Sequence, residues 1–359
     1  MPEKKSLTVY NEIKKEIFAG KFGKPGERFI TTRALTLGYG VSLVTAQRIM
    51  TRLREERLVY LMGKTTYLCY GKVSQKSTLA QKRKKTNVIG LHVVNIDNPY
   101  FSALVRAVEE EADRHGYKVI TKSSNYVVEE EKRALAHFEE LGVDGIISCP
   151  LQGKASVSAY KNMRLPFVFM SASVEGVDAD EVLINNYAGG TMVAKHLIEN
   201  GYENFMYVSS GVLKNVSDMR LKGFRDVVEK SGFSLPNENI IYADNTGKVF
   251  ENHVVSCLSQ IKKPLGIFCY HDILGVGVLR ICQQYGYSVP SDVGIVGYDN
   301  LRIIQDMFPT LSSVDYRIKN LVSSTVELLI KRIDGYEGES EKQFIEPVLT
   351  IKGSSQRLK

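Results

Sequence analysis

The sequence predicts an α/β protein in which a small helical head with a β-hairpin is followed by a larger body of alternating strands and helices. Helical hydrophobic patterns fill much of residues 1–70, and residues 71–86 lack hydrophobic periodicity. From residue 87 onward, short apolar runs alternate with helical segments. The 359 residues are 43% hydrophobic, which is enough for at least two domains with their own cores.

Three helices are predicted in the head. Apolar residues recur on one face of a first helix over residues 7–18, and the glycines that follow it end the helix. A second helix over about residues 31–36 can be capped by Thr31 or Thr32, and a third covers about residues 42–56. The glycine turn between the last two predicts a helix-turn-helix.

A two-stranded hairpin, or wing, is predicted after the third helix. Residues 58–61 and 67–70 are apolar or alternate in polarity on either side of a turn at Met62-Gly63-Lys64. We therefore interpret residues 1–71 as a winged helix-turn-helix domain and residues 72–86 as the linker to the body, residues 87–359.

The body is predicted to contain buried parallel strands. Each is a short apolar run separated from the next by a helical segment, and repeated units of this kind favour sheets covered by helices. The runs are Val88–Val94, Val119–Thr121, Gly145–Ser148, Phe167–Met170, Phe205–Val208, Gly266–Cys269 and Gly294–Gly297.

Charge is distributed unevenly along the chain. Residues 1–86 contain 19 lysines and arginines against 6 acidic residues, a net charge of +13, whereas residues 87–359 contain 28 against 34, a net charge of −6. A basic head of this kind is typical of a protein that binds a polyanion such as DNA. The charge alone also fits a solvated surface or a patch for an anionic membrane.

Several classes of protein are disfavoured by what the sequence lacks. It contains no signal peptide and no apolar stretch long enough to span a membrane, so we expect a cytoplasmic protein without a membrane partner. The five cysteines include no C-x-x-C pair and the histidines no metal-ligand spacing, so neither a metal nor another cofactor is expected. No G-x-S-x-G, P-loop or G-x-G-x-x-G motif points to an enzyme.

Two groups of motifs resemble known families. Residues 7–70 resemble the GntR-type winged helix through Tyr10-Asn11-Glu12-Ile13, Pro25-Gly26-Glu27-Arg28, Arg33-Ala34-Leu35, Gly40-Val41-Ser42 and Gly63-Lys64-Thr65. Residues 87–359 resemble the LacI-type sensor, which is related to periplasmic sugar-binding proteins, through Asn98-Pro99-Tyr100-Phe101, Gly142-Val143-Asp144-Gly145-Ile146, Asn186-Tyr187-Ala188-Gly189-Gly190, Arg220-Leu221-Lys222-Gly223-Phe224-Arg225, His271-Asp272 and Val296-Gly297-Tyr298-Asp299-Asn300. The combination is similar to the arabinose-repressor type of regulator.

The second resemblance implies a periplasmic-binding-protein-type sensor of two Rossmann-like lobes, joined by three crossing strands, with a ligand in the cleft between them. We place the crossings near Met170, Val314 and Phe344. Lobe 1 then covers about residues 87–170 and 315–343, and lobe 2 about residues 171–314 and 344–359. A cleft at the carboxyl ends of parallel strands is also where open α/β sheets bind ligands in general.

The third helix of the head is predicted to read the major groove of DNA. Gln47 can pair with adenine through two hydrogen bonds, and Arg48 can reach guanine or a phosphate, although each position also fits an ordinary exposed polar residue. Leu43 and Gln47 stand where many members of the family carry arginines, so the operator sequence cannot be transferred. The predicted DNA contacts are Arg33, Ser42, Thr45, Gln47, Arg48 and Lys64.

The predicted effector contacts combine aromatic and hydrogen-bonding side chains: Tyr100, Phe101, Ser171, Arg220, His271, Asp299 and Tyr316. Arg220 can donate two parallel hydrogen bonds to neighbouring hydroxyls or to a carboxylate. The alternatives are core packing for Phe101, a surface ion pair for Arg220 and a turn cap for Asp299, and Asp272 fits an N-cap better than a ligand contact. Ser171, Ala172, His271 and Tyr316 differ from the residues common in sugar-binding relatives.

The sequence is therefore interpreted as a homodimeric, DNA-binding transcription regulator, and as a repressor of carbohydrate-utilisation genes in particular. Its partners would be operator DNA and a small sugar-like effector, with a monosaccharide favoured, for example a deoxy sugar with an apolar edge. The alternative is a small-molecule receptor without a role on DNA. The basic head argues against that alternative.

Overall fold

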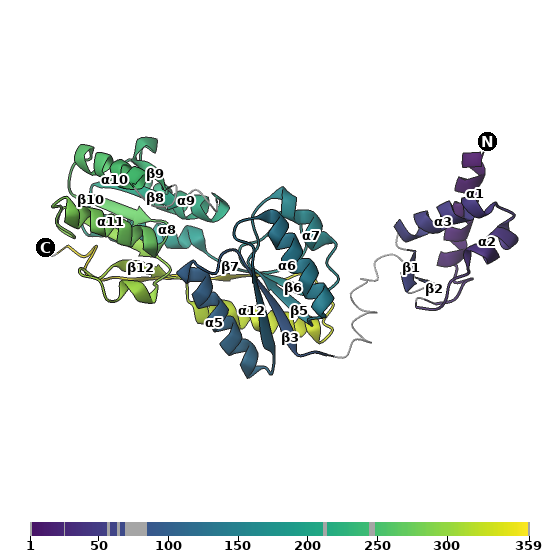
Figure 1. The fold of residues 1–359 in the computed structure, drawn as a ribbon. Coiled ribbons are helices and arrows are strands. Elements are labelled where there is room, and N and C mark those ends of the chain that lie inside the picture. Colours follow the sequence, from purple (N-terminus) through teal and green to yellow (C-terminus); the bar gives the residue numbers. More distant parts are fainter. Residues whose placement is uncertain are drawn as a thin grey trace. The chain divides into compact units, whose positions relative to one another are not determined.

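The computed structural model describes residues 2–24, 26–55, 58–62, 65–68, 85–210, 214–243 and 248–357. The chain divides into two compact units, Met1–Lys84 and Lys85–Lys359 (Figure 1). The predicted linker lies outside the described residues except for its last two. Of these, Thr86 belongs to the second unit, because its backbone N–H and its hydroxyl donate to the Asp144 carboxylate over 3.0 Å.

The head contains the three predicted helices and the hairpin: α1 (Pro2–Phe18), α2 (Thr32–Tyr39), α3 (Leu43–Glu55), β1 (Val59–Met62) and β2 (Thr65–Leu68). The helix α1 begins five residues earlier than predicted. Two hydroxyls cap the helix starts, because Thr31 Oγ1 accepts from Ala34 N and Ser42 Oγ accepts from Thr45 N, both over 3.2 Å. Gly40 ends α2 in the left-handed region, with φ 59°.

A single hydrophobic core holds the head together. Ile13 and Ile17 of α1 pack with Leu35 of α2 and Leu53 of α3, and all four are fully buried. The chain before α2 joins the hairpin, because Phe29 N donates to the Thr66 carbonyl over 2.8 Å. The head is therefore a three-helix unit with its small antiparallel sheet packed into the same core.

The second unit consists of two six-stranded sheets (Figure 1). The first has the order β13-β7-β6-β5-β3-β4 and is wholly parallel, and the second has the order β14-β12-β11-β10-β8-β9 with only β14 antiparallel. All seven predicted strands are confirmed: β3 (Val88–Val93), β4 (Lys118–Ser123), β5 (Gly145–Ser148), β6 (Phe167–Ser171), β8 (Asn204–Ser210), β10 (Leu265–Cys269) and β11 (Val293–Tyr298). The prediction did not identify β7 (Asp180–Ile184), β9 (Ile240–Ala243), β12 (Ser312–Asp315), β13 (Lys342–Ile345) and β14 (Val348–Thr350).

Helices follow most of the strands: α5 (Pro99–Arg114), α6 (Val128–Leu141), α7 (Val157–Lys161), α8 (Asn186–Glu199), α9 (Lys214–Lys230), α10 (Lys248–Gln260), α11 (Asp272–Gln284) and α12 (Ile318–Ile333). Both faces of the first sheet are buried. Ile147 and Val168 join one hydrophobic cluster, whereas their neighbours Ile146 and Phe167 join another. This burial on both faces explains why the strands read as continuous apolar runs. No described helix combines the length and the apolar character that a membrane span requires.

The first crossing between the lobes corrects the prediction. It follows Ile184 at the end of β7 and is not near Met170, because β6 and β7 are neighbours in the first sheet. The strand β7 begins with Asp180 and Glu181, so no apolar run marks it. Asp180 is nevertheless buried, because Arg332 of α12 pairs with its carboxylate over 2.6 and 2.7 Å.

The other two crossings lie within a few residues of their predicted positions. The second connects β12 to α12, between Asp315 and Ile318, and the third connects β13 to β14, between Ile345 and Val348. Lobe 1 therefore consists of residues 85–184 and 318–345, and lobe 2 of residues 186–315 and 348–357. Two chain segments build each lobe, so a movement of one lobe is transmitted through three short connections.

Candidate functional site

The outward face of α3 carries two of the polar residues predicted to contact DNA. Gln47 and Arg48 are exposed, and Arg33 is exposed as the second residue of α2. Ser42 and Thr45 are partly committed to the helix cap, because their hydroxyl oxygens lie 2.9 Å apart. Lys64 lies outside the described residues, as does Pro25 of the proline-glycine turn.

The helices α2 and α3 present a positive surface. Together they contain Arg33, Arg48, Arg52 and Arg54, and Glu55 at the end of α3 is their only acidic residue. Arginines on such a surface can neutralise phosphates and release the counterions that condense on DNA. This surface therefore has the charge that a nucleic-acid interface needs.

The first lobe contributes an aromatic group where its strands end. Asn98 caps α5 by accepting from Tyr100 N over 2.9 Å, and Pro99 takes the first helical position. This places Tyr100 so that its hydroxyl donates to Ser171 Oγ at the end of β6, over 2.7 Å. The Tyr100 ring lies 5.2 Å from the ring of Tyr316, just after β12, and 4.9 Å from that of Phe101.

The second lobe contributes a buried guanidinium. Arg220 of α9 donates from Nε to Asn186 Oδ1 over 2.8 Å and from Nη1 to the carbonyl oxygen of Tyr270. Its guanidinium carbon lies 3.5 Å from the ring centroid of Tyr298 and 4.6 Å from that of Tyr270. Two aromatic rings and two neutral oxygens thus hold the positive charge.

Asp299 lies close to this cation. Burial raises the pKa of its carboxyl group well above the usual range, with Arg220 opposing the rise and Asp272 adding to it. Tyr100 of lobe 1 responds to the same charges: burial raises the pKa of its hydroxyl, Asp299 adds to that rise and Arg220 opposes it. The predicted residues Tyr100, Arg220 and Asp299 are therefore brought together from the two lobes.

His271 and Asp272 have structural roles that the sequence did not predict. His271 is the N-cap of α11, because its Nδ1 accepts from Leu274 N over 3.2 Å, and burial lowers its imidazole pKa to about 4. The prediction that Asp272 caps this helix is wrong. Its Oδ1 accepts from Ser313 Oγ over 2.6 Å and its Oδ2 from Leu301 N over 2.7 Å, so Asp272 braces the loop that follows β11.

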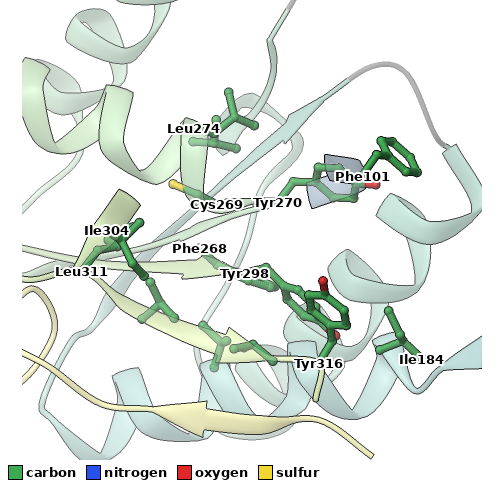
Figure 2. Close-up of a cluster of buried hydrophobic side chains, with 14 of the residues drawn as sticks. Phe101, Ile184, Phe268, Cys269, Tyr270, Leu274, Tyr298, Ile304, Leu311 and Tyr316 are labelled. Atoms are coloured by element: carbon green, nitrogen blue, oxygen red, sulfur yellow. The ribbon is translucent and has the colours of Figure 1, made fainter. Parts of the chain in front are cut away.

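The aromatic residues of both lobes belong to one hydrophobic cluster. Figure 2 draws Phe101 of lobe 1 and Tyr270, Tyr298 and Tyr316 within it. Phe101 is buried, in agreement with the core-packing alternative. Sequence reasoning missed Tyr270 and Tyr298 as supports of Arg220, although each lies at the end of a buried strand beside a residue that was identified.

Backbone strain is concentrated at these strand ends. Ser171 at the end of β6, Asp299 after β11 and Arg317 after β12 adopt positive φ values of 68°, 103° and 58°. A residue with a side chain pays free energy for this conformation, and strain of this kind clusters at ligand clamps and active sites. We call the group Tyr100, Ser171, Arg220, Tyr270, Asp299 and Tyr316 the interlobe cluster.

Comparison with known proteins gives this arrangement a context. Residues 194–355 match the family described as a periplasmic binding protein-like domain. The HTH-type transcriptional repressor PurR of Mannheimia succiniciproducens is 26% identical over 328 residues, covering 89% of this chain and 96% of that protein. PurR of Aliivibrio fischeri is 28% identical over 277 residues, covering 76% and 82%.

Solved structures share the fold of the second unit. A periplasmic binding protein/LacI transcriptional regulator from Alkaliphilus metalliredigens, complexed with D-xylulofuranose, is 27% identical with a TM-score of 0.66, covering 75% of this chain and 99% of that one. The transcription regulator CcpA of Lactococcus lactis has a TM-score of 0.68 at 22% identity, covering 76% and 100%, and supports the fold alone. These relatives are regulators and not enzymes. The chain is therefore a DNA-binding transcriptional repressor with a small-molecule effector, and its second unit contains a periplasmic-binding-protein-like domain.

Proposed function

We propose that this repressor controls genes of carbohydrate use and that its effector is a small sugar-like molecule bound at the interlobe cluster. The observation that carries the proposal is the contact of Tyr100 in lobe 1 with Tyr316 at the crossing after β12, with the buried Arg220 and Asp299 of lobe 2 near enough to act on the Tyr100 hydroxyl. A ligand that touches all three is bound best when the two lobes are close together.

The chemistry of the interlobe cluster favours a polyhydroxylated ligand. Within the described residues, Arg220 donates to Asn186 Oδ1 and to the Tyr270 carbonyl and interacts with the Tyr298 hydroxyl, so its five N–H groups are not all used, and no donor bonds the Asp299 carboxyl oxygens. Arg220 can therefore donate to hydroxyl oxygens, while the carboxyl group of Asp299, whose raised pKa favours the protonated form, can accept from one hydroxyl and donate to another. The rings of Tyr100 and Tyr316 provide an apolar surface for the C–H face of a sugar ring. The D-xylulofuranose bound to the Alkaliphilus regulator supports this choice.

The head is proposed to be a winged helix of the GntR type. The α2–α3 pair, the antiparallel hairpin and the strand-like segment bonded to β2 support this assignment. In this arrangement α3 enters the major groove, Gln47 pairs with adenine, and Arg48 contacts guanine or a phosphate. Arg33 and Lys64 would bind phosphates and so position the head without specifying a sequence. Such a regulator acts in the cytoplasm, where its operator is.

We further propose that the protein is a homodimer on a near-palindromic operator. Lobe 2 exposes Phe308 almost completely, at 89%, together with Ile303 and Tyr285. The Phe308 carbonyl accepts from Gln283 Nε2 over 2.7 Å, which links this loop to the end of α11. Exposed apolar residues of this kind mark interaction sites, and a symmetric dimer needs paired half-sites. We expect a dimer in sedimentation velocity and a monomer for Phe308→Glu; a wild-type monomer would contradict the assignment.

Induction follows from closure of the lobes around the effector. Closure moves lobe 1 relative to lobe 2. The start of lobe 1, from which the chain runs back to the head, moves with it. Effector that weakens operator binding by some factor must itself be bound more weakly by the operator complex, by the same factor. We therefore expect saturating effector to release the operator.

The test begins with a thermal-shift screen of the full chain against monosaccharides and sugar phosphates. A ligand at one hundred times its dissociation constant should stabilise the sensor by about 2.7 kcal/mol. Each hit is then titrated against an operator selected from random DNA. Release of DNA by a sugar supports the proposal, whereas stabilisation by non-sugar ligands alone would overturn the sugar assignment and leave the repressor function intact.

A further inference from the structure

The first turn of α3 exposes two aliphatic side chains. Leu43 is 52% exposed and Val44 is 60% exposed, and they are the first two residues of the helix. Neither belongs to the core of the head, which α3 supplies through Ala46, Ile49, Met50 and Leu53. The fold of the head therefore does not explain why these two positions are apolar.

Helical geometry places both residues on the outward face. Leu43 and Gln47 are four residues apart, as are Val44 and Arg48, so each aliphatic side chain lies one turn before an exposed polar one. The outward face of α3 thus begins with an apolar pair and continues with a polar pair. A recognition helix contacts base edges through its N-terminal residues, which here are Leu43 and Val44.

The charge around the pair argues for DNA as the occupant of this face. Arg33, Arg48 and Arg52 are exposed on the same two helices, and Glu55 is the only acidic residue in either. A surface this basic would repel a second copy of itself. A DNA groove offers a negative backbone for the arginines, and it also offers one apolar group, the 5-methyl of thymine.

We propose that Leu43 and Val44 recognise thymine methyl groups, and that they set a preference for thymine at the operator positions next to the base pair contacted by Gln47. This inference rests on the proposed DNA contact of α3. Burying one methyl group contributes about 0.8 kcal/mol, which corresponds to about a fourfold change in affinity at 1.4 kcal/mol per factor of ten. The selectivity would act together with the hydrogen bonds of Gln47.

Uracil substitution tests this directly, because uracil differs from thymine only by the missing methyl group. Full-length protein first selects an operator from random double-stranded DNA. Each thymine of that operator is then replaced by uracil, one at a time, and the affinity is measured by fluorescence anisotropy. We expect about a fourfold loss at one or two thymines in each half-site and no loss at the others.

Variants assign the methyl contacts to residues. Leu43→Ala and Val44→Ala should each bind the thymine operator more weakly and lose sensitivity to uracil at one of these positions. Leu37→Ala is the matched control, because Leu37 is an aliphatic residue of the same unit that is 86% exposed on α2. It should keep the full uracil sensitivity. Melting temperatures of all three variants check that the head is folded.

Two results would overturn the inference while leaving the repressor function intact. One is tight, selective binding in which no thymine methyl matters. The other is uracil sensitivity that persists unchanged in Leu43→Ala and Val44→Ala, which would assign the contacts to other residues. By contrast, failure of the full chain to select any DNA sequence would overturn the proposed function itself.

Discussion

Two arginines of the sensor, the partly buried Arg332 and the buried Arg220, make different sets of hydrogen bonds. Arg332 of α12 uses all five of its N–H donors: Nε and Nη2 bond the Asp180 carboxylate, and Nη1 and Nη2 bond the carbonyl oxygens of Tyr336, Gly338 and Glu339. Within the described residues, Arg220 of the interlobe cluster donates to two neutral oxygens, those of Asn186 and Tyr270, and its guanidinium also lies against Tyr298. The protein saturates the first arginine, whereas in our proposal the second keeps donors for a ligand.

We expect this difference to separate a structural charge, Arg332, from the proposed binding charge, Arg220. A buried ion pair that the protein satisfies completely fixes local geometry, here the turn that leads from α12 into β13. A buried cation held by neutral oxygens and aromatic rings keeps much of its field for a partner that arrives later. The residue type is the same at both positions and does not distinguish the two arginines. The number of N–H donors that each uses within the fold distinguishes them.

The largest effect is expected at the saturated arginine. Arg332→Ala leaves the Asp180 carboxylate, which is only 2% exposed, without its cation. Removing one partner of a buried pair typically costs 3–5 kcal/mol, so the free energy of unfolding of the sensor should fall by about that amount. Urea denaturation followed by circular dichroism measures it.

The neighbouring residue supplies the control for that measurement. Lys331 of the same helix pairs with Glu341 over 2.6 Å on the surface. Lys331→Ala should change stability far less than Arg332→Ala, because exposed pairs contribute little. Equal losses for the two variants would show that the bond to Asp180 is no more than a surface contact.

The second effect is expected at Arg220. Its substitution should change the response to effector more than the free energy of unfolding. Arg220→Ala should abolish the response to effector, since each hydrogen bond to a charged group contributes about 1.5–3 kcal/mol and its loss lowers affinity about tenfold to a hundredfold. Operator affinity without effector should stay nearly unchanged, because Arg220 belongs to the sensor and not to the head. Operator titration with and without effector measures both.

Arg220→Lys sharpens the comparison, because it keeps the charge and loses the planar fork of donors. If the charge alone recruits the effector, the lysine variant should respond almost as the wild type does. If directed hydrogen bonds are needed, it should behave like the alanine variant. An unaltered response in Arg220→Ala would remove this residue from the site.

Local patterns predicted a large part of this structure. The seven apolar strands and the cap at Thr31 follow from residues close together in the sequence, and all are present. The first crossing was misplaced because β7 begins with Asp180, whose partner Arg332 lies 152 residues away. A charge that is buried by such a distant partner looks like a surface charge in the sequence.

The site shows the same limit. Tyr100, Arg220 and Asp299 were identified through motifs, and the structure brings them together. Tyr270 and Tyr298 were not identified as partners of Arg220, because their rings meet the guanidinium only when β10, β11 and α9 assemble. The sequence motif identified His271 as a residue near the site. It did not predict that His271 Nδ1 accepts from Leu274 N and caps α11.

The third effect is a pH dependence of stability that we expect from a buried histidine. His92 is fully buried, its Nδ1 lies 2.9 Å from Ser148 Oγ, and burial lowers its imidazole pKa to about 4. The pKa in the folded state is below that of the unfolded chain, about 6.5, so the stability is present above pH 6.5 and is lost as the pH falls toward 4. The free energy of unfolding should fall by about 1–2 kcal/mol more in the wild type than in His92→Gln between pH 7 and pH 5.

An exposed histidine provides the reference for this pH series. His137 on α6 has an exposed side chain, so His137→Gln should follow the wild-type pH dependence. Glu131 lies 3.9 Å from His92 Nδ1, and burial raises its pKa. Its contribution to the free energy of unfolding therefore changes in the opposite direction and is lost as the pH rises. The comparison of variant with wild type isolates the histidine. Parallel curves for wild type and His92→Gln would show that this imidazole is protonated as readily in the fold as in water.

The smallest effect concerns the hydrogen bond from Tyr100 to Ser171 Oγ, 2.7 Å long and wholly within lobe 1. Tyr100→Phe keeps the ring against Tyr316 and removes the hydroxyl, and Ser171→Ala removes the acceptor. A double-mutant cycle should give a coupling of about 1 kcal/mol in the free energy of unfolding without effector. With saturating effector the coupling should shrink if the sugar takes these hydroxyls as partners, because the bond between them is then no longer made. A coupling that is the same with and without effector would place Tyr100 and Ser171 with Arg332, among the groups that the protein satisfies by itself.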